Sequence, residues 1–222
     1  MIDALIFDMD GLLFDSERIV QRSWEDCGNV LGLPGMGSHI YNTLGMNAAA
    51  RRVYFTREVG ADFPHEEFAA LTRVRFREIT DEEGLPMKPG VKELLTYARD
   101  HGLKTALATS SRGEYAMRNL TDAAIKEYFD GFVFGDMVSR AKPDPEIYLA
   151  ACQSIGTAPG RCMALEDSPN GIRSAHAAEM VPVMVPDLVR PDEELRSLTY
   201  KIVDTLHDVP AILEELNRDR TP

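Results

Sequence analysis

The chain has 222 residues, of which 44% are apolar and 27% are charged, a composition typical of a globular protein with a sizeable core and not of a disordered one. Lysine and arginine together number 24 against 36 aspartates and glutamates, so the net charge is −12 at pH 7. Because such a surface repels nucleic-acid phosphates and anionic lipid headgroups, we expect no nucleic-acid partner and no membrane partner.

Short apolar runs that are typical of buried parallel strands recur along the chain. The first covers residues 4–7 and ends at Asp8, Asp10 and Gly11. Further runs lie at 105–108, 131–134, 162–165 and 181–185, and helical patterns lie between or after them at 90–101, 112–121, 144–155 and 168–178. Because strand and helix alternate, we predict an α/β fold with a doubly wound parallel sheet.

One interval breaks this alternation. Between residues 15 and 84 the pattern is helical throughout, with candidate helices at 16–31, 48–59 and 65–80. A stretch rich in glycine and proline, 84–90, leads back to the alternating part. An insert placed after the first strand is expected to lie over the strand ends as a lid.

Polar residues follow the predicted strands at the edge where ligands collect in doubly wound sheets. Asp8 and Asp10 are two residues apart, so their side chains project to the same side of an extended chain. Two neighbouring carboxylates repel each other unless a cation or a proton lies between them. The pair therefore suits a hard divalent metal, or a nucleophile with an acid–base partner, although Asp-x-Asp-Gly is also a turn signature.

Three further segments allow both a chemical and a structural interpretation. Thr109, Ser110 and Ser111 are suited to holding a phosphate at a strand-to-helix turn, or to capping a helix. Lys142 stands before a proline and either balances a phosphoryl group or is a surface charge. Glu166 and Asp167 directly follow a buried strand, where they either share a metal with Asp8 or cap the next helix.

Together these segments resemble the four motifs of the haloacid dehalogenase superfamily, in its phosphatase and β-phosphoglucomutase-like branch. The motifs are FDMDGLL at residues 7–13, ATSS at 108–111, KPDP at 142–145 and LEDSPNG at 165–171. The resemblance covers nearly the whole chain. It implies an α/β core of residues 1–14 and 86–222, with a helical cap of residues 15–85.

The resemblance also implies a function and roles for residues. Asp8 would be the nucleophile that forms an aspartyl-phosphate, and Asp10 the general acid and base. Mg²⁺ would be held by Asp8, the carbonyl of Asp10 and Asp167, with Glu166 close by or bound through water. Phosphoryl oxygens would be held by Thr109, Ser110 and Lys142. The implied activity is Mg²⁺-dependent hydrolysis of a small phosphomonoester, such as a sugar phosphate or a nucleotide-like metabolite.

Several alternatives remain open beside hydrolysis. Mutases that resemble β-phosphoglucomutase carry a histidine where this chain has Val20, and an arginine where it has Ala48. Dehalogenases of the superfamily lack a second acidic residue, so Asp10 argues against that branch. A non-enzymatic phospho-acceptor module is usually near half this length and has no lid, and a binding protein on an inactive fold would lack a motif.

The candidate cap residues for substrate contact are Glu17, Arg51, Arg73 and Arg77. Alternatively, the arginines are solvated or paired with neighbouring glutamates. The expected partner is a small-molecule phosphate ester, and we expect a monomer.

Cysteine usage and the absence of targeting signals predict the compartment. Cys27, Cys152 and Cys162 are odd in number and far apart, which predicts free buried thiols in a reducing compartment. No apolar run reaches the ~18 residues of a membrane helix, and residues 1–4 lack the basic region of a signal peptide. We therefore expect a cytoplasmic protein.

Overall fold

The core of the molecule is a parallel sheet of six strands in the order β3-β2-β1-β4-β5-β6, which confirms the predicted fold class. The computed structural model describes residues 1–218; residues 219–222, which the expected core range includes, lie outside the described residues. The strands are β1 (Ala4–Phe7), β2 (Lys104–Thr109), β3 (Gly131–Phe134), β4 (Cys162–Glu166), β5 (Val181–Met184) and β6 (Lys201–Ile202). The sequence analysis missed β6, because two residues are too short to show any periodicity.

Helices cover both faces of the sheet, and alternate residues of β1 belong to two different hydrophobic cores. Leu5 and Phe7 pack with side chains of α4 (Val91–Asp100), α5 (Gly113–Asp122) and α9 (Val209–Arg218). Ala4 and Ile6 face the other way and pack with α6 (Glu146–Ser154) and α7 (Pro169–Ala177). This alternation explains why β1 is a continuous apolar run, since a strand buried on both faces needs no polar residue. A short helix, α8 (Glu193–Leu198), follows β5.

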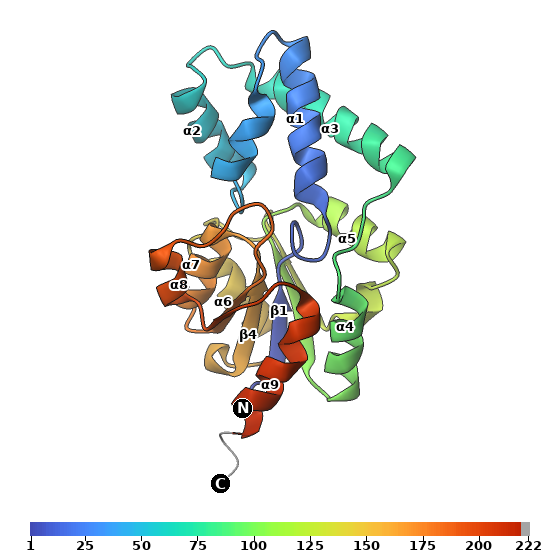
Figure 1. The fold of residues 1–222 in the computed structure, drawn as a ribbon, viewed down its shortest axis with the longest axis vertical. Coiled ribbons are helices and arrows are strands. Elements are labelled where there is room, and N and C mark those ends of the chain that lie inside the picture. Colours follow the sequence, from blue (N-terminus) through green and yellow to red (C-terminus); the bar gives the residue numbers. More distant parts are fainter. Residues whose placement is uncertain (219–222) are drawn as a thin grey trace.

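Residues 16–83 form a separate group of helices, which we call the helical unit. It contains α1 (Ser16–Val30), α2 (Ala48–Glu58) and α3 (His65–Glu83), as expected, and a 3-10 helix, η1 (Met36–Asn42). Shorter 3-10 helices elsewhere are η2 (Lys126–Tyr128), η3 (Pro159–Arg161) and η4 (Leu206–Asp208). The helical unit has its own apolar interior around Trp24, Phe55 and Phe68. Figure 1 shows it standing over one end of the sheet, with α1 rising above β1.

The chain crosses between the sheet and the helical unit twice, and the two crossings run side by side. The amide of Asp15 donates to the carbonyl of Pro86 at 2.9 Å, and that of Lys88 donates to the carbonyl of Leu13 at 2.9 Å. Asp187, in the loop after β5, binds the first turn of α1 and the second crossing. Its Oδ1 accepts from Arg18 Nη1 at 2.7 Å and from Lys88 Nζ at 2.8 Å. These contacts fix where the helical unit stands relative to the strand ends.

All three cysteines are buried free thiols, as predicted. Cys152, in α6, and Cys162, at the start of β4, lie in the core on that face of the sheet, and Cys27 lies in the interior of the helical unit. Within residues 1–218, no helix is long and apolar enough to cross a membrane.

Candidate active site

The ends of neighbouring strands bring the predicted polar residues together. Asp8 follows β1 directly, and its amide donates to the carbonyl of Leu165 at 3.0 Å, so the pairing of β1 with β4 continues past the strand. This contact holds Asp8 beside Glu166, the last residue of β4. Thr109 ends β2 on the other side of β1.

Lys142 is the centre of the buried charge cluster. Its side chain is 1% exposed, and Nζ lies 2.5 Å from Oδ1 of Asp8 and 2.5 Å from Oε1 of Glu166. It also donates to the carbonyl of Ala108 at 3.1 Å. Burial alone would lower the pKa of this ammonium, but the two carboxylates outweigh burial and raise it. Lys142 is therefore a structured internal cation, and the interpretation as a solvated surface charge is wrong.

Both carboxylate oxygens of Glu166 are engaged. Oε1 accepts from Lys142 and from the hydroxyl of Tyr148 at 2.8 Å. Oε2 accepts from the amides of Asp167 at 3.1 Å and Ser168 at 3.0 Å, and from Ser168 Oγ at 2.9 Å. Gly171 makes room for this arrangement, because a Cβ there would lie 1.8 Å from the carboxyl carbon of Glu166. Glu166 is thus held rigidly, with Lys142 as its charged partner.

Asp167, unlike Glu166, has a buried carboxylate without hydrogen-bond partners among the described residues. The residue is 2% exposed. Burial, followed by the charges of Glu166 and Asp8, raises its pKa well above the ordinary value. Gly11 leaves space beside it: with φ at +86°, a Cβ on Gly11 would lie 2.2 Å from Oδ2 of Asp167. A buried carboxylate without a partner requires a proton or a cation.

Asp8, Glu166 and Asp167 each place one carboxylate oxygen within 4.8 Å of the others. Burial raises the pKa of Asp8 to about 7, although Lys142 opposes this effect, and Glu166 adds to it. A single ammonium thus does not balance the negative charge gathered here. Oxygen donors, excess negative charge and an unpartnered carboxylate together fit a hard divalent cation such as Mg²⁺.

Asp10 is oriented by three hydroxyl groups. Ser16 Oγ donates to Oδ1 at 2.9 Å, and the hydroxyl of Tyr115 lies 3.4 Å from the same oxygen. Ser111 Oγ donates to Oδ2 at 2.6 Å. The sequence analysis assigned no role to Ser16 or Tyr115, and for Ser111 it predicted a phosphate contact or a helix cap, not a contact with Asp10. Ser111 was detectable as part of the hydroxyl-rich turn after β2, whereas Ser16 and Tyr115 come from distant elements and carried no local signal.

Thr109 and Ser110 lie at the same edge. Thr109 is buried, and its Oγ1 accepts from the amide of Ser111 at 3.1 Å. Ser110 Oγ donates to the carbonyl of Gly45 in the helical unit at 3.2 Å. From the other side, Asn170 Nδ2 donates to the carbonyl of Leu44 at 3.1 Å. The segment around Gly45 is therefore held directly over the strand ends.

A cavity of about 950 Å³ lies between the helical unit and the sheet. The sheet edge contributes Asp8, Asp10 and Asp167, together with the turn that contains Thr109 and Ser110. The helical unit contributes all four of its candidate residues, with Trp24 and the two positions that distinguish mutases: Glu17, Val20, Trp24, Ala48, Arg51, Arg73 and Arg77. Lys142 lies behind Asp8, and it does not line the cavity.

The candidate residues of the helical unit differ in their surroundings. Glu17, in the first turn of α1, is 9% exposed, and burial, followed by the charge of Asp10, raises its pKa to about 8. The guanidinium of Arg51 lies over Trp24, 6.0 Å from the ring centroid. Arg73 and Arg77 are exposed and also border a second hollow of about 390 Å³ along α3. Glu17 and Arg51 are therefore the inner pair, and Arg73 and Arg77 lie at the rim.

Comparison with known proteins relates the chain to one group of enzymes. Residues 2–179 match the family of haloacid dehalogenase-like hydrolases. The protein YhcW of Bacillus subtilis (strain 168) is 37% identical over 193 residues, which are 85% of this chain and 86% of YhcW. Hexitol phosphatase B of Escherichia coli (strain K12) is 33% identical over 186 residues, covering 82% of this chain and 83% of that protein.

A solved structure is similar over almost the whole length. CbbY from Rhodobacter sphaeroides, in complex with phosphate, superposes with a TM-score of 0.78 at 26% identity. The superposition covers 94% of this chain and 96% of that chain.

Proposed function

The chain belongs to the haloacid dehalogenase-like hydrolases and is a phosphatase, and from this premise we propose that it hydrolyses a small phosphomonoester with Mg²⁺ and an aspartyl-phosphate intermediate. The substrate we propose is a sugar phosphate or a nucleotide-like metabolite. We assign residues 1–14 and 86–222 to the core and residues 15–85 to a cap. We propose that the protein acts as a monomer.

The observation that carries this proposal is the arrangement of charges around Asp8. Lys142 holds Oδ1 of Asp8 while Glu166 holds Lys142, and Asp167 stands beside them without a partner. A carboxylate fixed at one oxygen and facing a cavity is suited to attack a phosphorus atom placed there. Among the relatives, a protein named hexitol phosphatase B supports a phosphorylated carbohydrate as substrate.

Asp8, the carbonyl of Asp10 and Asp167 would hold the Mg²⁺ ion, which supplies charge neutralisation for the phosphoryl group when bound. Glu166 is close to this set, but its oxygens already accept hydrogen bonds from Lys142, Tyr148 and the turn after β4. We therefore propose that Glu166 acts through Lys142, or through a water molecule, and not by direct ligation.

The proposed reaction has two steps. In the first, the carboxylate of Asp8 attacks phosphorus, a bond forms between them, and the bond from phosphorus to the ester oxygen breaks. Asp10 donates a proton to the leaving alkoxide, which departs as an alcohol. Thr109 and Ser110 stabilise charge on the phosphoryl oxygens, and Lys142, which lies behind Asp8 and not in the cavity, stabilises charge on Asp8 instead of the expected phosphoryl oxygens.

In the second step, water attacks the phosphorus of the aspartyl-phosphate. Asp10, now ionised, accepts a proton from that water, the bond to Asp8 breaks, and inorganic phosphate is released. The hydroxyls of Ser16 and Ser111 hold the Asp10 carboxylate in one orientation for both proton transfers.

A phosphosugar mutase is the alternative. Mutases resembling β-phosphoglucomutase need groups that hold a bisphosphate intermediate, and the two cavity positions expected to supply them are occupied by Val20 and Ala48. Neither side chain binds an anion, which supports hydrolysis. Incubation with glucose 1-phosphate separates the two activities, since a phosphatase releases inorganic phosphate and a mutase produces an isomeric sugar phosphate.

The proposal is tested with p-nitrophenyl phosphate. We expect phosphate release that requires Mg²⁺, is abolished by EDTA and falls at least about a thousandfold in Asp8→Asn. The matched control is Asp100→Asn, at an exposed aspartate that ends α4, far from the cavity. Release that continues at the wild-type rate in Asp8→Asn would overturn the nucleophile assignment.

A further inference from the structure

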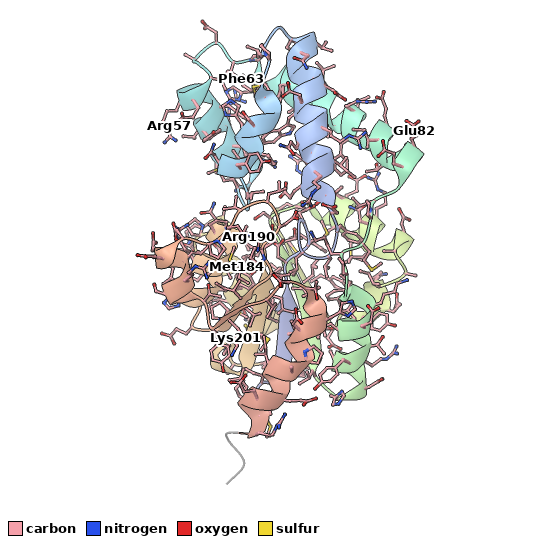
Figure 2. The ribbon with its side chains drawn as sticks, in the orientation of Figure 1. Arg57, Phe63, Glu82, Met184, Arg190 and Lys201 are labelled. Atoms are coloured by element: carbon pink, nitrogen blue, oxygen red, sulfur yellow. The ribbon has the colours of Figure 1, made fainter. Side chains whose placement is uncertain are left out.

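Asp187 is a buried carboxylate that lies outside the cavity and takes no part in the two steps of the proposed reaction. Its side chain is 2% exposed, although it belongs to the loop that follows β5. The amide of Val185, at the start of this loop, donates to the carbonyl of Glu166 at 2.7 Å, so the loop begins beside the last residue of β4. Figure 2 labels Met184, where β5 ends, and Arg190 in this loop, at the end of the sheet below the helical unit.

The same loop contacts the helical unit through apolar and charged side chains. Leu188 and Val189 pack against the apolar interior of the helical unit. Asp187 Oδ1 accepts from Arg18 Nη1 at 2.7 Å and from Lys88 Nζ at 2.8 Å. Because Arg18 belongs to α1 and Lys88 to the second crossing, a single carboxylate oxygen connects both segments to the end of the sheet.

The start of α1 depends on this external contact. Asp15, the N-cap residue, makes no side-chain hydrogen bond to the first turn, and its Oδ1 instead lies 2.5 Å from Arg18 Nη1. A helix without a side-chain cap is fixed less firmly at that end by its own residues. Arg18, which bridges Asp15 and Asp187, therefore takes a larger share in fixing where α1 begins.

The first turn of α1 also carries a hydrogen-bond donor to Asp10. Ser16 is 1% exposed, and its Oγ donates to Oδ1 of Asp10 at 2.9 Å. Ser16 and Arg18 are two residues apart in the same helical turn, so their main chains move together. Because a hydrogen bond weakens steeply with poor geometry, a displacement of this turn would remove the Ser16 donor and loosen the Asp10 carboxyl group.

We propose that Asp187 is a positioning residue for the proton transfers of Asp10. Asp187 holds Arg18, Arg18 fixes the first turn of α1, and Ser16 in that turn orients the Asp10 carboxyl group. This inference rests on the proposed function, in which Asp10 is the general acid and base. It adds to that function a residue that contacts neither the substrate nor the metal.

Two phosphate esters that differ in their leaving group detect a weakened general acid. Benzyl phosphate releases a strongly basic alkoxide that requires a proton from Asp10, whereas p-nitrophenyl phosphate releases a stabilised phenolate that does not. Since kcat/KM covers only the steps up to departure of the leaving group, hydrolysis of the aspartyl-phosphate does not enter the comparison. The measured quantity is the kcat/KM for p-nitrophenyl phosphate divided by that for benzyl phosphate.

In Asp187→Ala, we expect this ratio to rise by about tenfold or more, because kcat/KM falls for benzyl phosphate and changes little for p-nitrophenyl phosphate. A purely structural role would lower both values together and leave the ratio unchanged. Alanine is preferred to asparagine because Oδ2 of Asp187 is buried and, within residues 1–218, has no hydrogen-bond partner. An amide there would bury donors without acceptors. Arg18 and Lys88 both reach solvent, so water can hydrate them after the change.

A second variant breaks the same connection at an exposed residue. Arg18→Met should raise the ratio as Asp187→Ala does, and it decides the question if Asp187→Ala does not fold. The double variant should differ little from either single variant, since all three break one connection. Asp10→Asn is the positive control, and it should raise the ratio further because it removes the acid itself.

The matched control is Glu83→Ala. Arg22, one turn after Arg18 on α1, donates to both carboxylate oxygens of Glu83, at 2.7 and 2.8 Å. Both partners belong to the helical unit, so this ion pair does not connect α1 to the sheet. Figure 2 labels the neighbouring Glu82, at the outer end of α3. Glu83→Ala should leave the ratio unchanged.

The outcomes separate this inference from the function on which it rests. If the wild type hydrolyses both esters and Arg18→Met and Asp187→Ala keep its ratio, the positioning role is wrong and the phosphatase proposal stands. A rise of the same size in Glu83→Ala would also overturn the role given to Asp187. An unchanged ratio in Asp10→Asn would remove the general acid and this inference with it. If the wild type releases no phosphate from either ester, both proposals fail.

Discussion

Lys142 Nζ lies 2.5 Å from Oε1 of Glu166, and this contact positions the ammonium against the proposed nucleophile, Asp8. Glu166 itself is fixed by Tyr148 and by the turn after β4. The rigid side chain is thus the glutamate, and the lysine and the aspartate are oriented from it. A change at Glu166 should therefore disturb both Lys142 and Asp8.

Glu166→Gln should lower kcat on p-nitrophenyl phosphate by about 10–100-fold, the range typical of residues that orient the groups around a metal site. The neutral amide retains the shape of the side chain but removes the charge that holds Lys142. Tyr148→Phe, which removes one hydrogen bond and no charge, is the matched comparison and should have a smaller effect. Equal rates for Glu166→Gln and wild type would show that Lys142 is positioned without Glu166.

Lys142→Met should lose both turnover and stability. Removing one partner of a buried ion pair costs about 3–5 kcal/mol, because the remaining carboxylates are left without compensation. Bound Mg²⁺ would restore part of that loss. The measurement is urea unfolding of both proteins in EDTA and in Mg²⁺, and a normal stability of Lys142→Met in EDTA would contradict the role given to this ion pair.

Gly11→Ala should weaken Mg²⁺ binding, because the added Cβ would lie 2.2 Å from Oδ2 of Asp167. Gly35→Ala is a close control: φ is +84° at Gly35 and +86° at Gly11, but the Cβ at position 35 meets nothing within 4 Å. Both variants carry the same backbone strain, and only one crowds Asp167. Isothermal titration with Mg²⁺ in the absence of substrate should therefore show a lower affinity in Gly11→Ala alone. The same affinity in both variants would contradict the proposed role of Asp167.

Glu17 should make stability depend on pH. Its pKa is about 8 in the folded protein and near 4.5 in the unfolded chain, so between these values the folded state binds more protons. Stability relative to Glu17→Gln should therefore fall as pH rises from about 4.5 to about 8 and stay low above that. Urea unfolding of both proteins at pH 5 and pH 8 in EDTA measures this difference, since EDTA removes any cation that would screen Asp10. Parallel curves for the two proteins would show that Glu17 is not buried as described.

The sequence predicted the sheet and the strand-end residues well because both depend on local patterns. The apolar runs mark β1 to β5, and Asp8, Thr109 and Asp167 follow directly from where those runs end. The alternation of strand and helix then determines that these ends meet at one edge.

Contacts between distant segments left no such pattern. Ser16 and Tyr115 bind Asp10 from α1 and α5, and Asp187, in the loop after β5, joins α1 to the second crossing. These contacts depend on where whole elements lie, and single polar residues at those positions are common in any helix or loop. For the same reason, the sequence analysis treated Glu17, Arg51, Arg73 and Arg77 alike. Only the structure shows that the first two lie inside the cavity and that the two arginines of α3 lie at its exposed rim.

The central claim is that Asp8 forms a covalent bond to phosphorus, and chemical trapping tests it most directly. Enzyme quenched during turnover of p-nitrophenyl phosphate is reduced with borohydride, which converts an aspartyl-phosphate to homoserine, and the peptide that contains residue 8 is analysed by mass spectrometry. The account predicts homoserine at position 8 in samples quenched during turnover and none in samples without substrate. An unmodified Asp8 in every sample, while phosphate is still being released, would contradict it.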